Sequence, residues 1–235
     1  MDRIFGPLGL TVRGGWRLVH PGWRVEGTLP PGPAVLLVHH QNLFGPVCAE
    51  ALLPREPHLW VLQPFTRRQD CRRHYRDYTF SVRCGWPRPL AALAAGACSL
   101  VIPPLLSSLG AIPVCRGRRE ILTTLELSMQ VLNRGEQVLL CPDLDYSDGT
   151  PVLGPLYTGF LHLEKAWFRR HRTHLPFVPL YCSRKRRQLV IGPAVCFSGT
   201  LPFVQERSQI AQALRDRINA MGIACGDIPQ RPTQP

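Results

Sequence analysis

Apolar and polar positions change between two patterns along this chain, and together they predict strands and helices in alternation. Short apolar runs bounded by turns predict buried strands, and they lie at residues 24–27, 34–38, 111–114, 137–141, 177–181 and 189–191. Apolar positions at helical spacing predict amphipathic helices at residues 46–53, 120–132 and 160–168, and a last helix with Ile210, Leu214, Ile218 and Met221 on one face. This alternation is typical of α/β proteins. We therefore expect an α/β fold with a mixed, largely parallel sheet flanked by helices.

The length of 235 residues favours one large domain with short extensions rather than two domains. We expect a short helical or irregular leader at residues 1–23, the α/β domain at residues 24–222, and a flexible tail at residues 223–235.

One apolar segment raises the question of a membrane. Residues 89–115 are 27 uncharged residues between Arg88 and Arg116, long enough to cross a bilayer. The segment is rich in Ala and Gly and holds Pro103 and Pro104, which break a helix interior. We therefore expect a buried helix pair, or a segment that dips into one leaflet, rather than a span.

The charge is the unusual part of the composition. The net charge is +12, and 26 of the 28 basic residues are arginines, because Lys165 and Lys185 are the only lysines. This excludes an acidic solvating protein and favours a polyanionic partner: nucleic acid, an anionic membrane or a phosphorylated small molecule. Most of the excess lies at residues 66–77, 169–172 and 184–187. A charge run is often only a solvated surface, but aromatic residues flank the first stretch, so we expect an anionic membrane surface to meet Arg67, Arg68, Arg72 and Arg73.

The cysteines and the N-terminus indicate the compartment. Nine cysteines, with no Cys-x-x-Cys pair, exclude a zinc ribbon and favour free thiols in a reducing cytosol. The N-terminal segment lacks the apolar core of a secretory signal. No pattern requires a metal or a cofactor.

Three segments that follow predicted strands carry candidate chemistry. His39 and His40 end the strand at residues 34–38, where α/β proteins commonly place reactive groups, and a histidine is a suitable general base near neutral pH. Asp143, Asp145 and Asp148 follow the strand at residues 137–141, where they could orient a base, bind a metal or form a turn. The strand at residues 111–114 leads into Arg116, Arg118 and Arg119, which are suited to phosphate or to an ordinary basic loop.

In this order the segments resemble the glycerolipid (lysophosphatidic acid) acyltransferase family. Its first motif, Asn-His-x-Ser-x-x-Asp-Pro, is matched in frame by His39-His40-Gln41-Asn42-Leu43-Phe44-Gly45-Pro46. Its second motif, a Gly-x-Ile strand that ends in arginine, is matched by Gly110, Ile112 and Arg116. The third, Phe-Pro-Glu-Gly-Thr-Arg-Ser, is matched by residues 141–147, and the fourth, a Val-Pro pair, by Val178-Pro179. The resemblance runs from about Arg24 to Ile218, and the departures look like those of a divergent clostridial-type branch.

The resemblance implies a fold like that of glycerol-phosphate acyltransferases and a role for several residues. His40 would take the proton from an acceptor hydroxyl, which attacks the thioester of acyl-CoA or acyl carrier protein. Arg116, with Arg118 beside it, would bind the phosphate of the acceptor, and Asp143 takes the place of the third-motif glutamate.

One departure concerns catalysis. Gly45 stands where the family has the aspartate that orients the histidine, and losing such a carboxylate costs a serine hydrolase about 10⁴ in turnover. Either another acid replaces it, from among Asp143, Asp145 and Asp148, or the activity is weak or lost. We favour Asp145, and His39 could share the work.

The sequence therefore supports three functions in descending order. The first is an acyltransferase of phospholipid biosynthesis, with a lysophospholipid and an acyl thioester as substrates, located in the cytoplasm as a peripheral or monotopic protein on the inner face of the cell membrane. The second is a lipid-binding relative that has lost catalysis. The third, a nucleic-acid-binding protein, rests on charge alone and lacks a recognisable motif.

Overall fold

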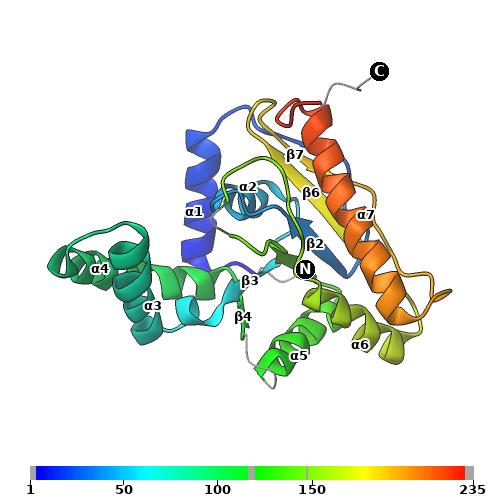
Figure 1. Ribbon diagram of the computed structural model, residues 1–235, viewed down its shortest axis with the longest axis horizontal. Helices are drawn as coiled ribbons and strands as arrows, with labels where there is room; N and C mark the ends of the chain where they lie inside the picture. The colour runs from blue at the N-terminus through cyan, green and yellow to red at the C-terminus, as the bar shows by residue number, and fades with distance from the viewer. Residues whose placement is uncertain (1–3, 116–119, 147, 231–235) are drawn as a thin grey trace.

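A central sheet of seven strands organises the molecule, as a computed structural model shows (Figure 1). The structure describes residues 4–115, 120–146 and 148–230. The strand order is β1-β7-β6-β2-β5-β3-β4, and every neighbouring pair is parallel except β6 and β7. The predicted α/β fold with a mixed, largely parallel sheet is therefore confirmed. The strands are β1 (Arg24–Glu26), β2 (Ala34–Val38), β3 (His58–Leu62), β4 (Ile112–Val114), β5 (Gln137–Leu140), β6 (Phe177–Ser183) and β7 (Gln188–Ile191).

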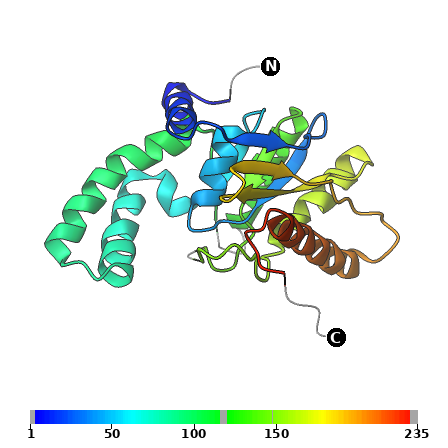
Figure 2. The same ribbon diagram turned by 90° about the horizontal axis from the view of Figure 1, so that it is seen from above.

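Helices cover both faces of the sheet (Figures 1 and 2). In β2, Val35 and Leu37 pack into the core beneath α5 (Glu120–Asn133), α6 (His162–His171) and α7 (Phe203–Ala224). The alternate residues Ala34, Leu36 and Val38 pack towards α2 (Phe44–Leu52) and Trp16 of α1 (Pro7–Val19). Because both faces of β2 are buried, its sequence is a continuous apolar run rather than an alternating one.

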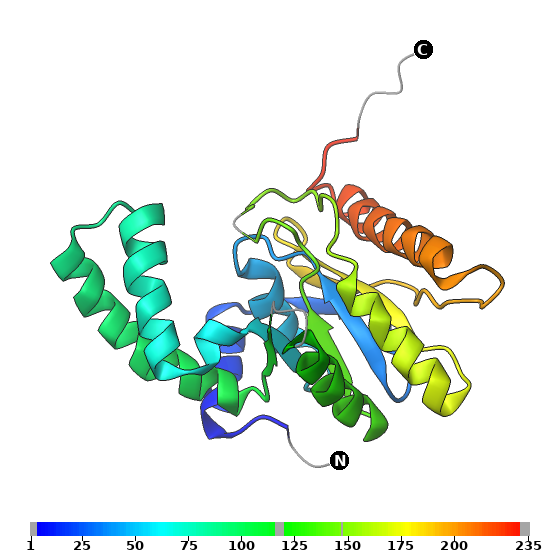
Figure 3. The ribbon, with the colours of Figure 1, turned by 60° about the horizontal axis from the view of Figure 1, so that its bottom comes forward.

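A helical hairpin between β3 and β4 extends away from the sheet (Figures 2 and 3). It begins with a short 3₁₀ turn, η1 (Gln63–Thr66), continues through α3 (Arg68–His74) into a π-helix, η2 (Tyr75–Arg83), and returns as α4 (Arg88–Ser108). We refer to residues 63–108 as the hairpin. One strand that borders it, β3, was absent from the sequence-based prediction.

Two other expectations differ from the structure. Most of the apolar segment at residues 89–115 lies in one 21-residue helix, α4 (Arg88–Ser108), which continues through Pro103 and Pro104, rather than in a pair of helices. The expected flexible tail is in part packed: α7 extends to Ala224, Ile228 is buried, and Asp227 accepts hydrogen bonds from Ser183 and Lys185. All nine cysteines are free thiols, as predicted.

Candidate active site

His39 and His40 lie at the carboxyl end of the central strand β2. This strand lies between β5 and β6, so the segments that leave these three parallel strands meet at one edge of the sheet. His39 is buried and His40 is half-buried. The carboxyl ends of parallel strands are the usual place for a site in α/β folds, and this is where the sequence placed the candidate base.

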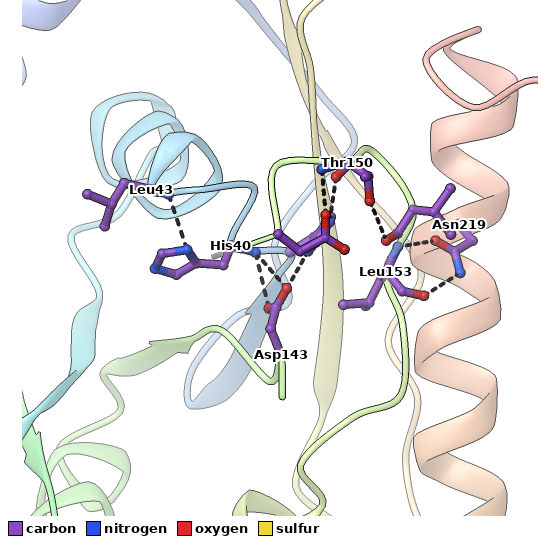
Figure 4. A network of polar contacts seen from close by, with 9 residues as sticks. His40, Leu43, Asp143, Thr150, Leu153 and Asn219 are labelled. Carbon is purple, nitrogen blue, oxygen red and sulfur yellow. Dashed lines mark hydrogen bonds and ion pairs between the residues drawn. The ribbon is translucent and has the colours of Figure 1, made fainter. Parts of the chain in front are cut away.

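A left-handed turn joins the two histidines to α2. Gln41, Asn42 and Leu43 have φ angles of 45°, 53° and 74°, a region that costs a residue other than glycine about 1–2 kcal/mol each. The turn brings the backbone N–H of Leu43 to the Nδ1 atom of His40, at 3.1 Å (Figure 4). Because Nδ1 accepts this hydrogen bond, the proton of the neutral His40 ring lies on Nε2.

The surroundings of His40 favour its neutral form. Burial lowers the pKa of His40, and the charges of His39 and Arg83 lower it further. The Asp143 charge and a hydrogen bond with the backbone of Tyr146 act in the opposite direction without reversing the shift. His40 is therefore an uncharged imidazole near neutral pH, as a base requires.

His39 has both ring nitrogens engaged. Its Nδ1 atom meets a carboxylate oxygen of Asp143, and its Nε2 atom lies 2.8 Å from the carbonyl oxygen of Thr150. Burial lowers the pKa of His39, but the hydrogen bond and charge of Asp143 outweigh it and raise the pKa overall. Since both partners are acceptors, the geometry suits an imidazolium that donates from both nitrogens. In this arrangement His39 connects β2 to the segment that carries Asp143.

Asp143 lies in a long loop, residues 141–158 between β5 and η3 (Gly159–Leu161), which we call the strap. The Asp143 carboxylate also accepts hydrogen bonds from the backbone N–H of His40, at 3.1 and 3.2 Å. At the far side of the strap, Asn219 of α7 holds Leu153 by two hydrogen bonds, at 2.8 Å to its N–H and 3.0 Å to its carbonyl oxygen (Figure 4). The strap is thus fixed to β2 at one point and to α7 at another.

Gly45 is a position without room for a side chain. A Cβ atom built on Gly45 would lie 1.8 Å from the carbonyl oxygen of His39 and 3.3 Å from Val38. The first turn of α2 therefore packs its backbone directly against the end of β2. An aspartate cannot occupy position 45 in this backbone conformation, so its absence is a property of the local fold as well as of the sequence.

The other predicted site residues are distributed between the strap and the hairpin. Asp145 is exposed, and Asp148 accepts a hydrogen bond from the backbone N–H of Thr150 at 2.8 Å. The predicted phosphate ligands Arg116 and Arg118 lie outside the described residues. Arg67, Arg68, Arg72 and Arg73 are exposed on the hairpin.

Large apolar side chains lie exposed on the segments that carry the polar groups. Leu43 and Val47 belong to the turn and first helical turn after His40, and Leu144 follows Asp143. A surface hollow of about 840 Å³ begins near the end of the strap, at Tyr157 and Gly159, and continues along α6. Its lining combines apolar with basic side chains, among them Leu122, Leu125, Phe168, Phe203, Lys165, Arg169 and Arg172. His40 does not line this hollow.

Sequence reasoning missed several groups that shape the site. Thr150 and Leu43 act through backbone atoms, which no residue pattern reveals, and Asn219 lies 66 residues from its partner Leu153. Arg83 was not selected either, although its charge reaches His40. Among the residues that the structure describes, no cluster of histidine, cysteine and acidic side chains could hold a metal ion.

The fold and the site together define an α/β protein with a histidine at the carboxyl end of its central strand and an acidic strap beside it. No protein-family model matches the chain, and no curated protein matches its sequence. The fold is similar to the crystal structure of the 1-acyl-sn-glycerophosphate (LPA) acyltransferase PlsC from Thermotoga maritima, with a TM-score of 0.54 and 10% sequence identity. The match covers 91% of this chain and 78% of that protein. This likeness shows that the chain has the fold of that acyltransferase.

Proposed function

We propose that this protein is an acyltransferase of lipid biosynthesis. It would move a fatty acyl group from acyl-CoA or acyl carrier protein to a hydroxyl of a lysophospholipid such as lysophosphatidic acid. The observation that carries the proposal is an uncharged, half-buried histidine at the carboxyl end of the central strand in a fold similar to that of PlsC. The exposed Leu43, Val47 and Leu144 beside it suit a substrate with a fatty chain.

In this proposal His40 is the general base. The acceptor hydroxyl gives its proton to His40, its oxygen attacks the thioester carbon, the C–S bond breaks, and the thiolate leaves and takes up a proton. The lone pair of neutral His40 is on Nδ1, where the Leu43 N–H now lies at 3.1 Å. The acceptor hydroxyl would therefore have to replace this N–H, which requires the left-handed turn to open. Three residues in the left-handed region make that turn the strained part of the site.

His39 and Asp143 then act as positioning residues. The contact between their side chains, together with the bonds from Asp143 to the His40 backbone, holds the strap against the end of β2. Asp145 remains the candidate for a carboxylate that approaches the base when the turn opens. Arg116 and Arg118 remain the proposed ligands of the acceptor phosphate.

The remaining parts of the proposal concern the donor and the location. The apolar and basic hollow along α6 would receive the phosphate groups of the acyl-CoA donor or the acidic acyl carrier protein, because its basic rim is complementary to phosphate groups and acidic side chains. The thioester itself would have to reach His40, which lies outside the hollow. A lysophospholipid lies in a membrane, so the protein would act on the inner face of the cell membrane, with Arg67, Arg68, Arg72 and Arg73 near anionic headgroups.

A second candidate function is lipid binding without acyl transfer. Two observations favour it: the Nδ1 atom of His40 accepts a backbone N–H, and position 45 has no room for an orienting carboxylate. A labelled-acyl assay separates the two candidates. Transfer to lysophosphatidic acid that needs His40 supports the enzyme, whereas saturable binding of the acceptor without transfer from either donor supports the second function.

A further inference from the structure

Helix α4 of the hairpin turns its larger apolar side chains away from the protein. Its buried positions recur every four residues and are small or compact: Ala91, Ala95, Ser99 and Pro103. Its exposed positions include Leu93, with 74% of its surface accessible, Leu100 with 55% and Val101 with 57%. A surface helix of a water-soluble domain has the opposite arrangement, with its large apolar residues towards the core.

The length and composition of α4 also distinguish it from an ordinary surface helix. The helix is 21 residues long, its most apolar window has a mean hydropathy of 1.9, and only 22% of that window is buried. No charged residue follows Arg88 within the helix. Small residues at the contact between helices and large ones outside are the arrangement of helices that pack in lipid.

The hairpin as a whole carries positive charge. The hairpin holds seven arginines but only two acids, Asp70 and Asp77; the arginines are Arg67, Arg68, Arg72, Arg73, Arg76, Arg83 and Arg88. All seven are exposed. Two of them, Arg73 and Arg76, pair with the two aspartates, which leaves an excess of cations for phosphate groups outside the protein.

Aromatic side chains line the same hairpin. Phe80 stacks on Trp86 with ring centroids 4.8 Å apart, and Tyr75 links Phe80 to Phe65 through contacts of 5.5 Å each. Tyr78 and Trp86 are partly exposed. Tyrosine and tryptophan favour the level of the lipid headgroups, where one side of the ring is apolar and the other is wet.

We propose that the hairpin docks on one leaflet of an anionic phospholipid bilayer. The outward face of α4 (Leu90, Leu93, Ala97, Leu100 and Val101) enters the acyl-chain region, and the arginines bind headgroup phosphates. This proposal names the element that would bring the protein to its lipid substrate. Only that role rests on the proposed function; the docking surface itself does not. The hairpin extends away from the sheet (Figures 2 and 3), so it can lie on a membrane without covering the sheet.

The same residues argue against a helix that crosses the bilayer and against a protein partner. A crossing would carry Arg83, Arg88 and the connecting turn through hydrocarbon, which is costly for each charge. A protein partner would have to match a long apolar face and an adjacent excess of arginines at once, whereas one phospholipid surface offers both chemistries.

Vesicle flotation with the full chain tests this inference. The vesicles contain phosphatidylcholine alone or with about one third phosphatidylglycerol. The wild-type protein is expected to float with the anionic vesicles, and Leu93→Asp/Leu100→Asp to lose at least about tenfold in partitioning. The control Leu122→Asp/Val204→Asp changes two equally exposed apolar residues on α5 and α7 and is expected to bind as the wild type does. Equal binding by the hairpin variant, or its loss to the same extent in the control, overturns the proposal.

Two further measurements fix depth and separate this inference from the proposed function. In Leu100→Trp, lipids brominated on their acyl chains are expected to quench the added fluorescence; no quenching in bound protein overturns insertion of α4. With a short-chain, water-soluble acceptor, Leu93→Asp/Leu100→Asp is expected to keep the wild-type kcat. If the protein binds vesicles through α4 but has no transferase activity, the docking surface is supported and the proposed enzyme is rejected. If it transfers acyl groups but does not bind vesicles through α4, the enzyme is supported and the docking surface is rejected.

Discussion

The backbone N–H of Leu43 donates a hydrogen bond to the Nδ1 atom of His40, over 3.1 Å. In serine hydrolases a carboxylate accepts a hydrogen bond from the Nδ1–H group of the histidine, which leaves Nε2 free as the base. Here the donor and acceptor are exchanged, so the neutral ring keeps its proton on Nε2. As a consequence, the Leu43 N–H occupies the basic nitrogen of His40, and any base chemistry there depends on the turn formed by residues 41–43.

Replacing Gly45 tests whether the missing aspartate could simply be restored. Gly45→Asp and Gly45→Ala are both expected to destabilise the protein by roughly 3 kcal/mol, because any Cβ meets the carbonyl oxygen of His39. Urea unfolding followed by circular dichroism measures the loss. A Gly45→Asp protein that is as stable as the wild type and transfers acyl groups faster would show that the position tolerates the family's residue.

The contact between His39 and Asp143 predicts a pH-dependent contribution to stability. The folded state raises the pKa of His39, so its contribution is complete below the unfolded value of about 6.5 and is lost as the pH rises through the folded value. Asp143→Asn removes the charge that raises this pKa. The stability difference between the wild type and Asp143→Asn is therefore expected to be largest near pH 6 and to shrink towards about pH 9. Urea unfolding across this range measures it; Asp216→Asn, at an exposed pair, is the control. A difference that does not change with pH contradicts the assignment.

Asn219 is expected to hold the strap in place and to contribute little to whether the protein folds. Asn219→Ala removes both hydrogen bonds to Leu153, at a cost of about 1–3 kcal/mol, and loosens the loop that carries Asp143. We expect kcat for acyl transfer to fall while the protein stays folded. The matched control is Asn133→Ala, which breaks a surface hydrogen bond to His171. Equal kcat in the two variants would show that the α7 anchor has no part in the reaction.

The buried carboxyl of Glu50 predicts a gain in stability on substitution. Neither of its oxygens has a hydrogen-bond partner, and burial raises its pKa well above the ordinary value, although Arg13 opposes the shift. A raised folded pKa gives stability that is present below the unfolded pKa and is lost as the pH rises, at about 1.4 kcal/mol per pH unit until the folded pKa is reached. Glu50→Gln removes this loss, so its stability relative to the wild type is expected to grow from about pH 5 upwards.

Chemical unfolding at several pH values measures this effect. Glu126→Gln, at an exposed glutamate of α5, is the control and is expected to follow the wild type. A Glu50→Gln protein whose relative stability does not change with pH would contradict a buried, neutral carboxyl.

The sequence predicted the structure best for elements that are buried on both sides, because these consist almost entirely of apolar residues. The continuous apolar run at residues 34–38 could belong only to a buried element, and the histidines that follow it lie at the edge where the sheet places its site. The strand β3 was not predicted, although four consecutive apolar residues, Leu59 to Leu62, follow His58 in it. All five of its residues are half-buried in the structure.

Other features depend on contacts that no local pattern contains. Glutamine and leucine rarely adopt positive φ angles, so the side chains of Gln41 and Leu43 do not predict the left-handed turn. Two consecutive prolines predict a broken helix, yet α4 continues through Pro103, which packs on its buried side. Which histidine is engaged by Asp143 is decided by the relative placement of β2 and the strap, 104 residues apart.

The central claim, that His40 is the base of an acyl transfer, is tested most directly by transfer of a labelled acyl group to lysophosphatidic acid. Acyl-CoA and acyl carrier protein are offered in turn as donors, to the wild type, His40→Ala and the surface control His171→Ala. We predict that the wild type and the control form labelled phosphatidic acid, and that His40→Ala, folded as the wild type is, loses activity by about 10²–10⁴-fold. Activity in His40→Ala equal to that of the wild type would contradict the account.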